Sequence, residues 1–185
     1  MRAHLLVALL AASGPAVGQE LPLVHFAAGD PRLPLPSSSV QAVYQDRTGF
    51  VWLGFFSSGL ARYDGHSLEL YGVDDGLADA SVREVAEDGA GHLWVATEAG
   101  LSVSELPLDR FEPNQRVRFL REVGGRELPA TRIRHNWLAA SGRGEVWVGV
   151  AGEGVVRYRF GAGGDLEVGV VGASAGDDPA PLSAI

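Results

Sequence analysis

The sequence of 185 residues contains neither cysteine nor lysine. Without cysteine the chain forms no disulfide, no thiolate metal site and no cysteine nucleophile. Because all 15 basic residues are arginine, a Schiff-base lysine and the lysine of a phosphate-binding loop are excluded as well. These two absences remove several common enzyme classes before any motif is considered.

Long apolar runs are also missing, apart from a short one near the N-terminus. No stretch approaches the roughly 20 apolar residues that a membrane-spanning helix needs, and Leu5–Ala12 is the longest uninterrupted run. Arg2 precedes this run, a Ser-Gly-Pro break follows it, and the small residues Ala16 and Gly18 stand just before Gln19. This layout is typical of a cleavable secretory signal peptide.

We therefore predict a helical signal peptide over residues 1–18 and a lead-in segment over residues 19–39. Cleavage is expected between Gly18 and Gln19. The mature protein is then exported, and we expect it in the periplasm or as the extracytoplasmic part of a membrane-bound protein.

The net charge of −8 argues against nucleic acid as a partner. One stretch is rich in arginine, but Glu122, Val123 and Glu127 interrupt it, so we interpret it as a solvent-facing strand. The arginines of this stretch are Arg116, Arg118, Arg121, Arg126, Arg132 and Arg134.

An internal repeat is the strongest signal in the sequence. The segment Val40–Trp52 matches Val82–Trp94 at an offset of 42 residues, with Asp-x-x-Gly-x-hydrophobic-Trp in both. A third copy, Leu138–Gly149, has Ser141 in place of the aspartate. Repeats of this length, rich in short alternating runs and turn residues, are typical of β-propeller blades of four antiparallel strands.

The predicted fold is therefore all-β, an incomplete β-propeller of about three four-stranded blades. We place the partial propeller at 40–185, with blades at about 40–71, 82–123 and 135–171 and the start of a further blade at 182–185. Closed propellers typically have four to eight blades. We therefore expect the remaining blades to come from downstream sequence or from another subunit.

The repeated residues are interpreted as structural. Aspartate and glycine suit the turns, because aspartate bonds nearby backbone and glycine accepts a positive φ. The tryptophans are expected to pack between blades rather than to stack on a sugar ligand, since each recurs at the same repeat position. The structural positions are Asp46, Gly49, Trp52, Gly59, Leu60, Asp88, Gly91, Trp94, Gly100, Leu101, Gly144, Trp147 and Gly154.

These residues, together with the run Tyr63-Asp-Gly65, resemble the two-component regulator propeller repeat over roughly residues 35–160. The resemblance implies the periplasmic sensor region of a bacterial hybrid or sensor histidine kinase, or of a related signalling protein. It thus implies an extracytoplasmic ligand, with carbohydrate as one candidate. A kinase or other output domain would belong to downstream sequence.

We predict no catalytic residue, no metal site and no cofactor for this chain, and the ligand-binding residues cannot be read from the sequence. The histidines lie far apart, and His66 and His92 fall in predicted turns, where we expect both to be exposed. An exported propeller enzyme, a lyase or glycan-active protein with its site at the central channel, is the alternative. The segment Leu106–Gln115 lengthens the second repeat and is either a binding loop or a spacer.

Overall fold

The computed structural model describes residues 30–112, 115–123, 126–128, 138–141, 143–150, 154–161 and 165–171. The predicted signal peptide over 1–18, the first part of the lead-in segment and the predicted further blade at 182–185 lie outside the described residues. The first residues of the predicted third blade, 135–137, lie outside them too.

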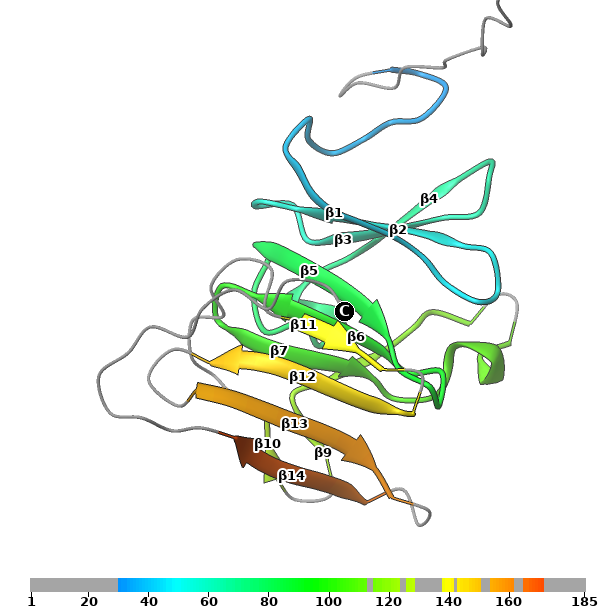
Figure 1. Cartoon of the computed structure of the whole chain (residues 1–185). Coiled ribbons are helices and arrows are strands. Elements are labelled where there is room, and N and C mark those ends of the chain that lie inside the picture. Colours follow the sequence, from blue (N-terminus) through cyan, green and yellow to red (C-terminus); the bar gives the residue numbers. More distant parts are fainter. Residues whose placement is uncertain are drawn as a thin grey trace, which may run out of the picture.

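Three four-stranded antiparallel sheets make up the described structure, which confirms the predicted all-β, propeller-type fold (Figure 1). The strands of each sheet are hydrogen-bonded in the order in which they occur in the chain. The first sheet consists of β1 (Val40–Gln45), β2 (Val51–Phe55), β3 (Leu60–Tyr63) and β4 (Leu68–Tyr71). The second consists of β5 (Val82–Glu87), β6 (Leu93–Thr97), β7 (Gly100–Ser104) and β8 (Phe119–Leu120). The third consists of β11 (Leu138–Ala140), β12 (Glu145–Val150), β13 (Gly154–Phe160) and β14 (Leu166–Val171).

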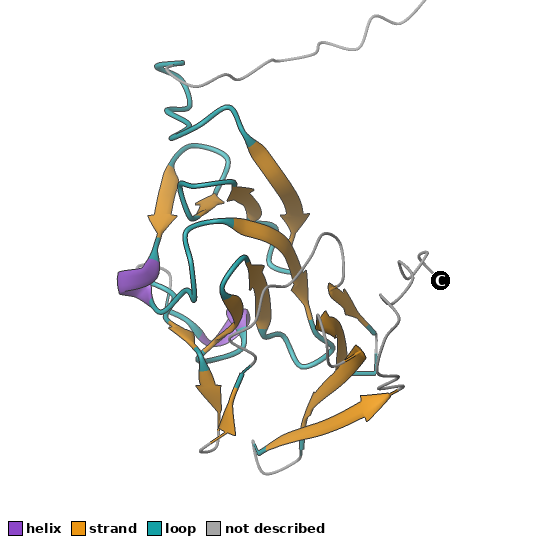
Figure 2. Ribbon diagram, turned by 90° about the vertical axis from the view of Figure 1, so that its left-hand side faces the viewer, coloured by secondary structure: helices purple, strands orange, loops and turns teal. Residues whose placement is uncertain are grey.

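Two short helical turns lie in the described connections between strands. The 3-10 turn η1 (Val73–Asp75) joins the first sheet to the second, and η2 (Leu108–Arg110) lies in the connection from β7 to β8. A small hairpin of β9 (Glu122–Val123) and β10 (Arg126–Glu127) follows the second sheet. Figure 2 shows the sheets from the side, with the two helical turns confined to the connections. Among the described residues, no helix is long and apolar enough to cross a membrane.

The repeat in the sequence is reproduced in the strand register. The pairing of β1 with β2 is interrupted by a bulge between Val40 and Ala42, and the pairing of β5 with β6 by a bulge between Val82 and Glu84. A bulge bends the strand that carries it. β1 and β5, the first strands of their sheets, therefore bend at the same point of the repeat. β5 lies beside both β1 and β11 (Figure 1).

The hydrophobic core lies between the sheets rather than within one of them. One cluster joins Trp52, Leu60 and Tyr71 of the first sheet to residues of the second, among them Phe119. The other cluster joins Trp94 and its neighbours in the second sheet to residues of the third, among them Tyr158. The first and second sheets therefore each bury apolar surface against the sheet that follows them in the chain.

Close packing at the first junction, where the first sheet meets the second, requires a glycine. A Cβ at Gly54 of β2 would lie 2.5 Å from Val82 Cγ1 of the second sheet, well inside van der Waals contact. The third copy has Gly149 at the equivalent place after its tryptophan, and this residue is also buried. The small residue lets neighbouring sheets approach each other.

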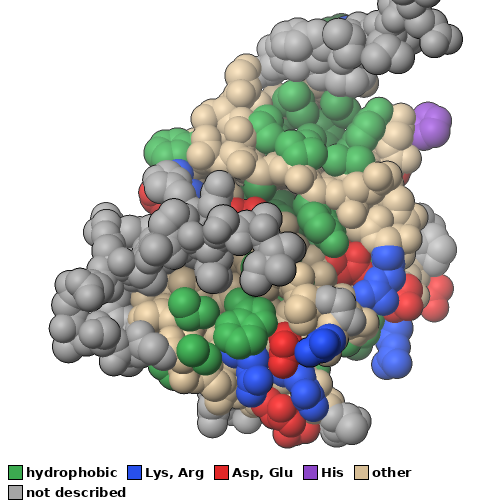
Figure 3. Space-filling model, viewed as in Figure 1, with side chains coloured by type: hydrophobic (Ala, Val, Ile, Leu, Met, Phe, Trp, Pro, Cys, Tyr) green, Lys and Arg blue, Asp and Glu red, His purple; other side chains and the backbone are tan. Residues whose placement is uncertain are grey.

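The first sheet carries exposed apolar side chains. Val43 is 68% exposed, and Leu70 is exposed as well. Figure 3 shows hydrophobic side chains gathered over this end of the molecule. At the opposite end, Trp147 of the third sheet is only partly buried, whereas Trp52 and Trp94 are fully buried.

Candidate functional site

The aspartate of the first repeat binds both its own turn and the repeat tryptophan. Asp46 Oδ1 accepts hydrogen bonds from the Thr48 backbone N–H, 2.9 Å away, and from the Phe50 backbone N–H, 3.1 Å away. Its other oxygen, Oδ2, accepts a bond from Trp52 Nε1 at 2.7 Å. Asp46 and Trp52 are both buried, so this bond satisfies an indole N–H that would otherwise lose its hydration without compensation.

The second repeat has the same arrangement. Asp88 Oδ1 accepts bonds from the backbone N–H groups of Ala90 and His92, and Oδ2 accepts a bond of 2.8 Å from Trp94 Nε1. Burial alone would raise the pKa of Asp88. Its pKa nevertheless lies below the ordinary value, because His92 and Trp94 favour the charged carboxylate.

The third repeat keeps the turn but loses the bond to tryptophan. Ser141 N–H donates to Glu145 O at 2.7 Å, and Gly144 N–H donates to Ser141 O at 3.1 Å. The backbone bonds of the two aspartate turns have the same pattern. The Ser141 hydroxyl accepts only a long bond from Arg143 N–H. The turn therefore closes without aspartate, and the distinctive role of Asp46 and Asp88 is to hold the tryptophan.

The remaining repeat positions lie in turns or in the core. Leu60 and Leu101 are buried at the start of the third strand of their sheets. Gly59 has a φ of 76°, and a Cβ there would collide with the Tyr71 carbonyl oxygen. The other repeat glycines also have positive φ, which favours glycine; they are Gly49, Gly91, Gly100, Gly144 and Gly154.

The arginine-rich stretch is not simply a solvent-facing strand. Arg116 Nε lies 2.5 Å from Asp75 Oδ1, and its Nη1 lies 3.1 Å from Glu69 Oε1. The guanidinium also bonds the Leu70 carbonyl and lies 4.6 Å from the centroid of the Tyr71 ring. The side chain of Arg116 thus ties the β7–β8 connection to the end of the first sheet, whereas Arg118 and Arg121 are exposed as expected.

The polar contacts of the first junction differ from those of the second junction, where the second sheet meets the third. At the first junction, Arg47 pairs with Glu87 and donates a bond of 2.8 Å to the Asp88 carbonyl. The counterpart of Arg47 in the second repeat is Gly89, and the counterpart of Glu87 in the third is Ala140. The second junction therefore cannot form this ion pair.

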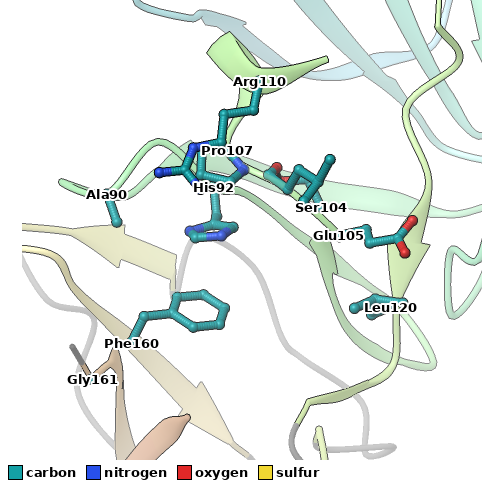
Figure 4. Close-up of a pocket in the computed structure, with 10 residues that line it drawn as sticks. Ala90, His92, Ser104, Glu105, Pro107, Arg110, Leu120, Phe160 and Gly161 are labelled. Carbon is teal, nitrogen blue, oxygen red and sulfur yellow. Dashed lines mark hydrogen bonds between the residues drawn. The ribbon is translucent and has the colours of Figure 1, made fainter. Parts of the chain in front are cut away.

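A cavity of about 520 Å³ lies at the second junction (Figure 4). It is bounded by the turn between β5 and β6, the connection after β7, and the end of β13. Figure 4 shows the ring of His92 facing that of Phe160, and the guanidinium of Arg110 on the same side of the cavity as His92. The lining residues are Ala90, His92, Ser104, Glu105, Leu106, Pro107, Arg110, Leu120, Phe160 and Gly161.

The position of His92 corrects the expectation that it is exposed. Its side chain is 13% exposed, and its ring stacks on Phe160 with centroids 4.1 Å apart. His92 Nδ1 is buried, has no hydrogen-bond partner among the residues that the structure describes, and lies 3.7 Å from Asp88 Oδ2. This contact could not be predicted from the sequence, because Phe160 lies outside the repeated pattern. His66, in contrast, is exposed as expected.

Among the described residues, no group of three or more histidine, aspartate or glutamate side chains is arranged to hold a metal ion. The cavity also contains no nucleophile activated by a neighbouring base: the Ser104 hydroxyl donates to the Leu106 carbonyl and accepts from the Leu93 backbone N–H. The volume and the lining of the cavity make it a candidate for binding a small molecule.

Residues 34–57 match the model of a protein family described as two component regulator propeller. The match spans the lead-in to β1, the first aspartate turn and β2, so it supports the resemblance at the residues that suggested it. No protein of curated function matches the sequence.

The fold is similar to that of two solved extracellular domains of hybrid two component systems from B. thetaiotaomicron. The first has a TM-score of 0.59 and 21% identity over 80% of this chain. The second has a TM-score of 0.52 and 17% identity, also over 80% of this chain. This chain spans only 19% and 18% of those two structures. At these identities the similarity establishes the fold.

Proposed function

We propose that this chain, which carries a two component regulator propeller repeat, is an extracytoplasmic ligand-sensing segment of a bacterial signalling protein. Its role is to bind a ligand and to pass the binding signal to an output region elsewhere in the signalling system. The chain itself binds rather than catalyses.

The family match at residues 34–57 is the observation that carries this proposal. Two features support it. The residues of the N-terminus have the layout of an export signal, and the fold is similar to that of two extracellular domains of hybrid two component systems. The cavity between the second and third sheets supplies a place for a ligand.

Export can be tested by fusing alkaline phosphatase after Val171, the last described residue. The phosphatase needs disulfides that form outside the cytoplasm. We expect an active fusion in intact bacteria, and an inactive one when Leu9→Arg and Leu10→Arg place charges in the apolar run. As a control, β-galactosidase, which is active in the cytoplasm, is fused at the same position. An active β-galactosidase fusion together with an inactive phosphatase fusion would contradict the proposed function.

A further inference from the structure

The cavity at the second junction is built from residues that depart from the repeat. His92 occupies the position held by Phe50 in the first copy and by Glu145 in the third. Phe160 belongs to an extension of β13, which has 7 residues where β3 has 4. Arg110 lies in the segment inserted between β7 and β8. The cavity is therefore particular to this junction and is not a gap common to all blades.

The walls of the cavity combine apolar and polar surface. Leu106, Pro107, Leu120 and the ring of Phe160 contribute apolar surface, and the polar atom of Ser104 is already bonded to the backbone. Figure 4 shows the carboxylate of Glu105 directed away from His92 and Phe160. An occupant of this space therefore needs an apolar face for Leu106, Pro107, Leu120 and Phe160 and a polar group for the remaining side chains.

One positive charge at this cavity is not neutralised. Arg110 is exposed and forms no ion pair or hydrogen bond with any described side chain, although carboxylates outnumber arginines in the sequence. Guanidinium binds carboxylate through two parallel charge-assisted hydrogen bonds. The arginine at the cavity therefore selects for an anionic group on the occupant.

From this combination we infer that the cavity binds a small ring-shaped carboxylate, with the ring against Phe160 and Leu120 and the carboxylate on Arg110. An aromatic acid and an acidic sugar both have this chemistry. The inference rests on the proposed function and names the ligand class of its site.

Isothermal titration calorimetry of the purified full chain tests the assignment. Benzoate and glucuronate are the two acidic probes, and benzamide and glucose are their neutral counterparts. We expect at least one acid to bind with a Kd of about 1 mM or below, and its neutral counterpart to bind at least about tenfold more weakly. Binding of benzoate alone identifies an aromatic acid, and binding of glucuronate alone identifies an acidic sugar.

Two variants locate the binding. Arg110→Gln should weaken it at least about tenfold, whereas Arg118→Gln, an exposed arginine outside the cavity, should leave it unchanged. Ala90→Phe places a ring in the cavity from an exposed turn position and should abolish binding. The assignment is wrong if neither acid binds at about 10 mM, or if Arg110→Gln binds as well as the unmodified chain. Either result leaves the export test of the proposed function untouched.

Discussion

At the scale of single residues, the pair of aspartate and tryptophan is the unit that the repeat preserves. Asp46 joins its turn to Trp52, and Asp88 joins its turn to Trp94. The sequence suggested turn residues and packing residues as separate features. The bond between them could not be read from spacing, because it depends on how the tryptophan side chain bends back over its own turn.

Removing the aspartate should destabilise the fold more than removing its counterpart in the third repeat. Asp46→Ala leaves the buried Trp52 indole N–H and three turn donors without an acceptor. We expect the free energy of unfolding to fall by about 2–4 kcal/mol, measured by urea denaturation. Ser141→Ala is the matched control, with an expected loss below about 1 kcal/mol. Similar losses in the two variants would contradict a special role for the aspartate.

The lowered pKa of Asp88 makes stability depend on pH in the acidic range. Because the pKa in the folded protein lies below the ordinary value for aspartate, the contribution of this carboxylate is present above that ordinary value and is lost as the pH falls through the folded pKa. Denaturation curves at several pH values should show stability declining below about pH 4. In Asp88→Asn, which is less stable at neutral pH, the decline should be shallower. An unchanged slope would show that other carboxylates account for the decline.

At the scale of elements, the contacts between neighbouring sheets are the part of the fold that could not be predicted from the sequence. The repeat correctly predicted four strands per blade, and glycine and aspartate marked the turns. From the sequence, the inserted segment Leu106–Gln115 is either a binding loop or a spacer. In the structure it supplies Arg110 to the cavity, and Arg116, the residue that follows it, contacts the first sheet. Neither role could be predicted from the sequence. The partners of Arg116 are Glu69 and Asp75, at the end of the first sheet, and Phe160, which lines the cavity with Arg110, lies outside the repeated pattern.

Arg116 should stabilise the first junction moderately. Its guanidinium bonds Asp75, Glu69 and the Leu70 carbonyl, but its side chain is 46% exposed, so solvent screens the ion pairs. We expect Arg116→Gln to lower the free energy of unfolding by about 1 kcal/mol, with a smaller loss in high salt. Arg118→Gln, two residues away and exposed, should have almost no effect. Equal effects of both substitutions would rule out a specific link at Arg116.

At the scale of the whole molecule, the fold is a row of three sheets in which apolar surface is buried between neighbours. Trp52 packs against Tyr71 of its own sheet and Phe119 of the second sheet. Trp94 packs against Tyr158 and Phe160 of the third. The sequence predicted packing for all three tryptophans because they share a repeat position. It could not show that Trp52 and Trp94 each pack against the blade that follows in the chain.

Trp147 is at the same repeat position without such a neighbour among the described residues. Arg157 lies 5.9 Å from the centroid of its ring, and the residue is only partly buried. The same arrangement, with Arg62 5.9 Å from Trp52, occurs in the first sheet, where the second sheet covers it. The comparison of these two tryptophans therefore reports the contribution of the following blade together with that of the aspartate bond, which Trp52 has and Trp147 lacks.

The central structural claim is that the sheets are consecutive blades and that the repeat tryptophan of one blade is buried by the blade that follows it. It is tested most directly by the free energies of unfolding of Trp52→Ala and Trp147→Ala, measured by urea denaturation followed by far-UV circular dichroism. We expect a loss of about 3–5 kcal/mol for Trp52→Ala and of about 1 kcal/mol or less for Trp147→Ala. Equal losses for the two variants would contradict this order of packing.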